Sequence, residues 1–155
     1  MSTSRQAKER ELTRGMLRIA RIYRKEVNRS LASYGISDAQ AVPVLHIARF
    51  GGGIRQTVLA EEIGIEGPSL VRLLDQLCLH GLVERHDDSR DRRAKTLHLT
   101  AAGEALAVRV EAALQELRGR LLAPVSDSAL DATLATLATL DAGLMEPDAP
   151  SGDDA

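Results

Sequence analysis

The sequence contains few aromatic residues and a single cysteine. Tyr23, Tyr34 and Phe50 are the whole complement of Phe, Trp and Tyr in 155 residues, so we expect an aliphatic core. One cysteine excludes an intramolecular disulfide and fits a reducing compartment. No stretch approaches the roughly 18 to 20 apolar residues of a membrane span, and the N-terminus lacks the apolar region of a signal peptide. We therefore expect a soluble cytoplasmic protein without a membrane partner.

The patterns of catalytic and metal sites are also missing. The Gly-Gly-Gly run at residues 51–53 has no Lys-Ser/Thr after it and no strand before it, as a phosphate loop requires. Cys78, His80, His86 and His98 show neither CxxC nor HxxxH spacing, which argues against a zinc site. Cys78 lies in an apolar helical run, which favours a packed thiol over a redox sensor. We predict no enzyme, no cofactor and no metal.

The chain has no excess of basic charge. Its formal net charge of −2 would not by itself suggest a nucleic-acid partner. Lys and Arg number nine against three acids in residues 1–30, eight against nine in residues 31–100, and three against ten in residues 101–155. The last third is therefore excluded as a nucleic-acid surface, whereas the five basic residues between positions 85 and 95 form a local positive cluster.

The centre of the chain predicts a helix-turn-helix. Residues 55–63 read as a short helix ending at Gly64, and a second helix opens with Pro68, where the missing N–H costs nothing. Leu70, Leu74 and Leu77 of that second helix recur at helical spacing and predict its packed face.

A polar face remains on the second helix. Ser69, Arg72 and Gln76 fall on another side and carry donors suited to base edges in a major groove. With Pro68 they form the predicted DNA-reading face. Taken alone, Arg72 is equally compatible with a solvated charge on a helix surface.

A wing is predicted directly after these helices. Residues 82–86 and 95–99 are β-leaning runs, and the loop between them contains Arg90, Arg92 and Arg93. Arginine is favoured in a narrow minor groove by its negative potential. Asp91 would repel DNA, so its expected part is to shape the tip by orienting an arginine. The alternative is an ordinary charged loop.

These residues carry a family resemblance. Residues 59–103 resemble the winged-helix core of the MarR family of bacterial transcription regulators, closest to its SlyA-like members, and the likeness extends over about residues 10–145. It is strongest in IGIEGPSLVRLLDQL and DRRAKTLHLT, with Gly103 following. The resemblance implies a homodimer on a pseudo-palindromic operator, and it makes Arg92 the first candidate for groove insertion.

The flanking segments predict long helices. One runs from about residue 4 to residue 32, and Ser37 begins another with a capping-box partner at Gln40. Thr100 begins a helix to about residue 122, and Ser126 begins a last one whose apolar residues are Leu130, Leu134, Leu137, Leu140 and Leu144. The winged helix is too small to bury these faces, so self-association is expected.

We therefore predict a mainly α protein with a small β-wing, a winged helix-turn-helix core and long N- and C-terminal dimerisation helices. A single domain is expected over residues 1–155. Residues 1–35 and 100–146 would form the dimerisation helices, residues 37–99 the winged helix-turn-helix, and residues 147–155 a disordered acidic tail.

The resemblance also implies an effector. Family members commonly release DNA when a small aromatic carboxylate lodges between the dimer helices and the winged helix. Arg21, Tyr23 and His46 are the groups near that junction in sequence order, and arginine can hold a carboxylate bidentately. The alternative is a constitutive DNA binder in which Arg21 is solvated and His46 is structural.

The resulting hypothesis is a nucleoid-associated bacterial transcription regulator. It would bind double-stranded DNA as a homodimer and repress transcription. Two alternatives stay open. One is a winged-helix module that binds proteins and has no operator, and the other is a ligand-independent regulator that activates by displacing other DNA-binding proteins. Three arginines at a hairpin tip favour DNA over a protein partner.

Overall fold

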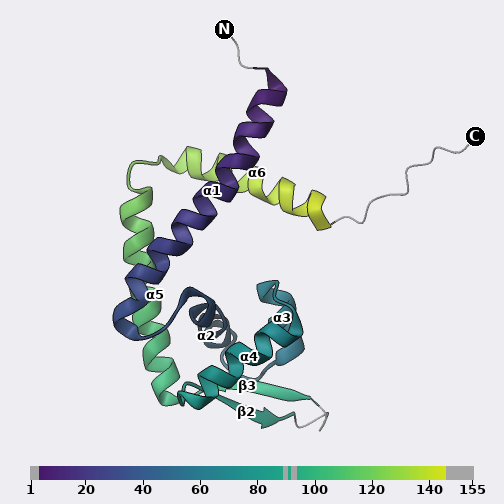
Figure 1. The fold of residues 1–155 in the computed structure, drawn as a ribbon, viewed down its shortest axis with the longest axis vertical. Helices are drawn as coiled ribbons and strands as arrows, with labels where there is room; N and C mark the ends of the chain where they lie inside the picture. The colour runs from purple at the N-terminus through teal and green to yellow at the C-terminus, as the bar shows by residue number, and fades with distance from the viewer. Residues whose placement is uncertain (1–3, 89–90, 92–93, 146–155) are drawn as a thin grey trace, which may run out of the picture. The chain divides into compact units, whose positions relative to one another are not determined.

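The computed structural model describes residues 4–88, 91 and 94–145. Its helices and strands confirm the predicted fold class, mainly helical with a small sheet (Figure 1). In chain order they are α1 (Arg5–Leu31), the short 3-10 helix η1 (Ala32–Tyr34), α2 (Asp38–Phe50), β1 (Ile54–Arg55), α3 (Gln56–Ile63), α4 (Gly67–Leu79), β2 (Val83–Asp87), β3 (Lys95–Leu99), α5 (Ala101–Leu122) and α6 (Asp127–Met145).

Two compact units divide the chain. The first, Met1–Leu117, holds the helix-turn-helix, the sheet and most of α5, and the second, Arg118–Ala155, holds the end of α5 and all of α6. No residue of α6 is buried, and Leu134 and Leu137 are among its exposed large side chains. Across the described part of the chain, no helix combines the length and the apolar character needed to cross a membrane.

Local signals set the helix starts. The Ser4 hydroxyl accepts the N–H of Ala7 before α1, and the Ser126 hydroxyl accepts that of Ala129 before α6. Ser37 and Gln40 form the predicted capping box at the start of α2, each side chain accepting a backbone N–H of the other residue. Such a box satisfies donors that the first helical turn leaves without partners.

The helix-turn-helix is formed by α3 and α4. Gly64 ends α3 at a φ of 64°, a left-handed conformation that glycine adopts without a Cβ penalty. Helix α4 begins one residue before the predicted start, so that Pro68 is its second residue, still within the turn that lacks internal acceptors. Leu70, Leu74 and Leu77 are completely buried, which confirms the predicted packing face.

The sheet has one more strand than the sequence pattern predicted. Its order is β1-β3-β2, all antiparallel, with Leu97 of β3 opposite both Ile54 and Arg85. Strand β1 consists of two residues, which is too short for an alternating pattern. The strand forms by pairing with β3, more than forty residues later in the chain, so the local pattern alone places Arg55 in the following helix.

The junction between the sheet and α5 is tightly packed. The Thr100 hydroxyl donates to the carbonyl of Gly81 and accepts the N–H of Gly103. The backbone N–H of Thr100 donates to the carbonyl oxygen of Leu82. A Cβ placed on Gly103 would lie 2.0 Å from that same oxygen, so the position requires glycine.

The core of the first unit is aliphatic, as expected. Its buried members come from α1, α2, the helix-turn-helix, the sheet and α5, and Tyr23 and Tyr34 only border it. Much of α1 is outside this core: Val27 and Leu31 are buried, whereas Leu17 and Ile19 are exposed. Helix α1 therefore carries an apolar surface that the core of the first unit does not cover.

Candidate nucleic-acid interface

The exposed side of α4 carries the residues predicted to read DNA. Pro68, Ser69, Arg72 and Gln76 are all exposed, whereas the leucines of the opposite face lie in the core. Pro68 and Ser69 occupy the first turn, and Arg72 and Gln76 follow one and two turns later. Their positions on one solvent-facing stripe suit entry into a major groove, with the N-terminal residues of the helix toward the bases.

The base of the wing is held by an ion pair that the sequence analysis missed. Nε of Arg55, immediately before α3, lies 2.7 Å from Oδ2 of the largely buried Asp88. The other carboxylate oxygen of Asp88 accepts the N–H of Asp91. The Asp88 carboxylate raises the pKa of Arg55 above its ordinary value, first by this hydrogen bond and then by charge attraction.

Further contacts close the end of the hairpin. The N–H of Asp88 donates to the carbonyl of Ala94, and the N–H of Ala94 donates to that of Asp91. Arg90, Arg92 and Arg93 lie outside the described residues, so their predicted role at the tip stays a prediction, as does the orienting role of Asp91. In the described part of the wing, the Asp88 carboxylate contacts both Arg55 and the N–H of Asp91.

Two of the basic residues counted in the positive cluster are paired with acids. Arg85 lies 2.6 Å from Asp75 of α4, and Lys95 forms an ion pair with Asp87. Nε and the second terminal nitrogen of Arg85 are buried without an acceptor among the described residues. Arg85 therefore links β2 to an exposed carboxylate of α4, and this pairing offsets its positive charge.

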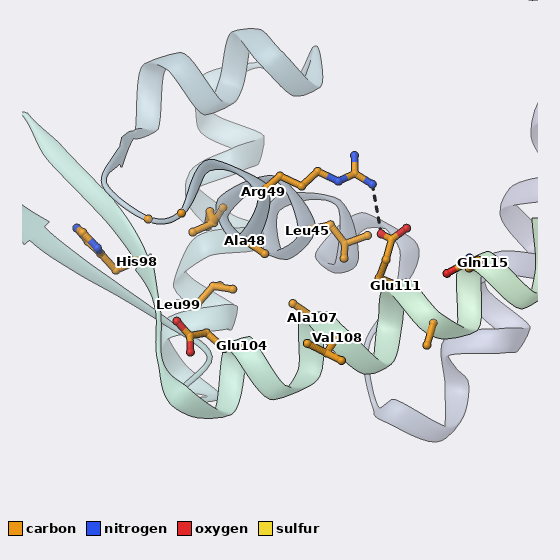
Figure 2. Close-up of a pocket in the computed structure, with 14 residues that line it drawn as sticks. Leu45, Ala48, Arg49, His98, Leu99, Glu104, Ala107, Val108, Glu111 and Gln115 are labelled. Carbon is orange, nitrogen blue, oxygen red and sulfur yellow. Dashed lines mark hydrogen bonds and ion pairs between the residues drawn. The ribbon is translucent and has the colours of Figure 1, made fainter.

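A pocket lies between α2, the end of β3 and α5. Its volume is about 710 Å³, and Leu45, Ala48, Ala107 and Val108 contribute to its apolar lining. Figure 2 shows Leu45 and Ala48 of α2 opposite the α5 residues. Arg49 bridges the two helices at one side, 3.2 Å from Glu111.

The other side of this pocket reaches the sheet. His98 of β3 lines it, and the ring of His98 stacks on that of His86 in β2, with centroids 4.5 Å apart. The pocket thus contacts β3, one of the two strands that carry the wing, and the helix α5. A molecule bound there would touch both the hairpin base and α5.

The three residues predicted to bind a ligand lie outside this pocket. Arg21 is exposed on α1, Tyr23 packs against the core, and His46 is half-buried on α2. None of the three is among the residues that line the pocket between α2 and α5. Arg49 and His98 line this pocket but are not among the predicted ligand residues, and no local sequence pattern joins them. The ligand role of Arg21, Tyr23 and His46 stays a prediction.

The remaining candidate groups are metal-ligating side chains and the thiol of Cys78. Within residues 4–88, 91 and 94–145, no three His, Cys, Asp or Glu side chains are grouped so that they could hold a metal ion. Cys78 is a free thiol, half-buried and packed against the core. Its environment agrees with the packed thiol that the sequence favoured.

Comparisons with known proteins agree with this architecture. Residues 34–94 match the sequence profile of the MarR family. The crystal structure of the transcriptional regulator PA3341 is 34% identical, covers 86% of this chain and 97% of its own, and superposes with a TM-score of 0.78.

Two other solved structures share the fold at lower identity. Staphylococcus aureus MepR in complex with DNA is 20% identical over 91% of this chain and 96% of its own, with a TM-score of 0.72. Staphylococcus aureus MarR in complex with salicylate and kanamycin is 22% identical over 88% of this chain and 91% of its own, with a TM-score of 0.78.

Proposed function

This chain belongs to the MarR family of DNA-binding transcriptional regulators, and we propose that it represses transcription as a homodimer on a pseudo-palindromic operator. The observation that carries the proposal is the exposed stripe of Pro68, Ser69, Arg72 and Gln76 on a helix whose other face is fully buried. Such a helix is rigidly seated and keeps donors free for base edges. Arg90, Arg92 and Arg93 would extend the contact into the flanking minor groove.

The exposed apolar surfaces of α1 and α6 support the proposed homodimer. Leu17 and Ile19 of α1 are exposed in the first unit, and Leu134 and Leu137 of α6 are exposed in the second. Large exposed apolar side chains on long helices are typical of subunit interfaces. A two-fold dimer would place its two recognition helices about one duplex turn, roughly 34 to 36 Å, apart, which a palindromic site requires.

The direct test is an electrophoretic mobility shift on the DNA upstream of the gene that encodes the chain. We expect a discrete complex that survives competitor DNA, and a reporter gene behind that DNA should be less active when the protein is present. A reporter that becomes more active would favour the alternative of activation by displacement. If the protein selects no duplex from a random library, the alternative of a protein-interaction module is favoured.

We further propose that a small aromatic carboxylate releases the protein from DNA by binding in the pocket between α2 and α5. The salicylate in the structure of Staphylococcus aureus MarR supports this ligand class. The pocket offers apolar walls for a ring. Arg49 at its side pairs with Glu111, so a ligand carboxylate would have to replace Glu111 as the partner of this guanidinium. The ligand must favour the conformation that does not bind DNA, since equal affinity for both conformations shifts nothing.

Substitutions separate this pocket from the one predicted around Arg21, Tyr23 and His46. Salicylate titrated into the operator complex should release the wild type at millimolar concentration. If the ligand uses the pocket between α2 and α5, Arg49→Gln should resist release, whereas Arg21→Ala and His46→Ala should respond like the wild type. The reverse pattern would favour the predicted set, and no release of the wild type would favour a constitutive binder.

A further inference from the structure

The amide of Gln76 on α4 is hydrogen-bonded to a residue of another helix. Nε2 of Gln40, in the first turn of α2, donates to Oε1 of Gln76 at 3.2 Å. Gln40 is half-buried and Gln76 is exposed. The residue predicted to read a base is therefore already held by one partner within the protein.

The orientation of the Gln40 amide is set by the capping box. A glutamine amide can turn by half a rotation to exchange its oxygen and nitrogen, so its hydrogen-bond partners decide which way it points. The backbone N–H of Ser37 lies 3.1 Å from Oε1 of Gln40, and a backbone N–H can only donate. The oxygen of Gln40 must therefore face Ser37, and its nitrogen must face Gln76.

The orientation of Gln76 follows from that of Gln40. An amide nitrogen has no acceptor capacity, so Gln76 must offer its oxygen to Gln40. The nitrogen of Gln76, with two N–H donors, is then the group left for an outside partner. The chain of donors runs from the backbone of Ser37 through Gln40 to the recognition helix.

The first turn of α2, which carries Gln40, is held by contacts with α1. The N–H of Asp38, the first residue of α2, donates to Oδ1 of Asn28 at 2.9 Å, and the Asp38 carboxylate lies 3.3 Å from Nε of Arg24. Both partners belong to α1. The turn that carries Gln40 is thus tied to a neighbouring helix, which limits fraying at this end of α2.

We propose that Gln40 is a positioning residue that determines base specificity, because it makes Gln76 present donors to the DNA. The inference rests on the proposed function, in which Gln76 faces base edges. A donating Gln76 suits the acceptors of guanine or the O4 of thymine. Bidentate reading of adenine requires the amide oxygen to face the N6 donor, and the hydrogen bond to Gln40 instead turns that oxygen toward α2.

The substitution Gln40→Glu tests this directly. The introduced carboxylate can still accept the N–H of Ser37, as in the common capping box with Glu, so the start of α2 should stay folded. Its second oxygen, however, is an acceptor, and Gln76 must turn its nitrogen toward it. Gln76 would then present its oxygen to the DNA, and preference at its base pair should shift, by about tenfold, toward adenine or cytosine, which offer donors.

A second pair of variants removes the effect of the added charge. The new carboxylate also repels phosphates and should lower affinity for all sequences alike. Gln76→Ala should change preference at the same base pair, and Gln40→Glu in the Gln76→Ala background should lower affinity without changing preference. Preference is measured for the four full-length proteins on duplexes selected from a random library by the wild type.

The outcomes separate the inference from the function on which it rests. If Gln76→Ala changes preference and Gln40→Glu does not, Gln76 reads a base but Gln40 does not orient it, and the inference is wrong. If Gln76→Ala leaves preference unchanged, Gln76 reads no base. Its proposed role as a base-reading residue of the DNA interface is then wrong as well. A shift seen only when both Gln40→Glu and an intact Gln76 are present supports the inference.

Discussion

Arg55 and Asp88 form an ion pair, with 2.7 Å between Nε and Oδ2, that ties the start of α3 to the base of the wing. The two residues are 33 positions apart in the chain. Because Asp88 also accepts the N–H of Asp91, one carboxylate connects the helix-turn-helix to the wing loop. The pair thus sets the wing relative to the helices that would lie in the major groove.

We expect Asp88→Asn to weaken operator binding, although it removes a negative charge from the DNA side. The amide keeps an oxygen that can accept the N–H of Asp91 but loses the charge that holds Arg55. Arg55→Gln should have a similar effect, and the double variant should be little worse than either, because both remove the same interaction. Fluorescence anisotropy with labelled operator measures all three.

A matched control for this prediction is Asp87→Asn. Asp87 is exposed and pairs with Lys95 across the wing strands. Its neutralisation should leave affinity unchanged or raise it slightly, since a repulsive charge is removed. Additive effects of Asp88→Asn and Arg55→Gln, or a gain in affinity from Asp88→Asn, would contradict the positioning role.

Gly103→Ala should destabilise the protein by about 1 to 3 kcal/mol, the usual cost of forcing a group into a packed site. The added Cβ would lie 2.0 Å from the carbonyl oxygen of Leu82, which the N–H of Thr100 already holds. Chemical denaturation measures the loss. Gly119→Ala, in the same helix with no atom within 4 Å of its Cβ position, should instead stabilise by about 0.5 to 1 kcal/mol.

Leu134→Glu should convert the homodimer to a monomer and abolish operator binding while leaving the fold of the chain intact. Leu134 is 63% exposed in the single chain, so the substitution creates no buried charge unless a second subunit covers it. Leu137→Glu should act in the same way. Light scattering at low micromolar concentration gives the mass, and circular dichroism gives the helix content.

The control for the dimer is Thr139→Glu, on the opposite side of α6 by helical spacing. It should remain dimeric and bind DNA. A wild-type protein that is a folded monomer at this concentration would remove the geometric basis for a palindromic operator.

Arg92→Ala should reduce binding most on operators with A·T-rich flanks. Arg92 is the wing residue that the motif favours for the minor groove, whose narrow form in A-tracts attracts arginine. Arg90 is the alternative candidate for the minor groove, and Arg90→Ala should have the smaller effect on binding. Affinities on otherwise identical operators with A·T or G·C flanks provide the measurement, and equal losses on both would argue against groove insertion.

The sequence predicted the elements that local chemistry determines. Ser37 with Gln40, Gly64 and Pro68 mark helix ends through backbone hydrogen bonds or dihedral preference within a few residues, and the structure confirms helices at those places. The buried leucines of α4 could be predicted because their spacing matches the helical period, which places them on one face of the helix.

The features that the sequence did not predict depend on distant contacts. Strand β1 exists because Ile54 pairs with Leu97, and Asp88 gains its role from Arg55. Neither pair has a spacing that a local pattern could reveal. The only hint at Asp88 is an acidic doublet at the entrance to a basic loop, which is equally typical of a solvated turn.

The central claim, that α4 reads base sequence, is tested most directly by Arg72→Ala. Binding of the wild type and the variant is measured on the operator, on operators with each base pair of the half-site replaced, and on unrelated DNA. The account predicts a loss of about 1 to 3 kcal/mol per half-site on the operator, a relaxed preference at one base pair, and little change on unrelated DNA. An equal loss on every sequence would make Arg72 a phosphate contact and contradict the claim.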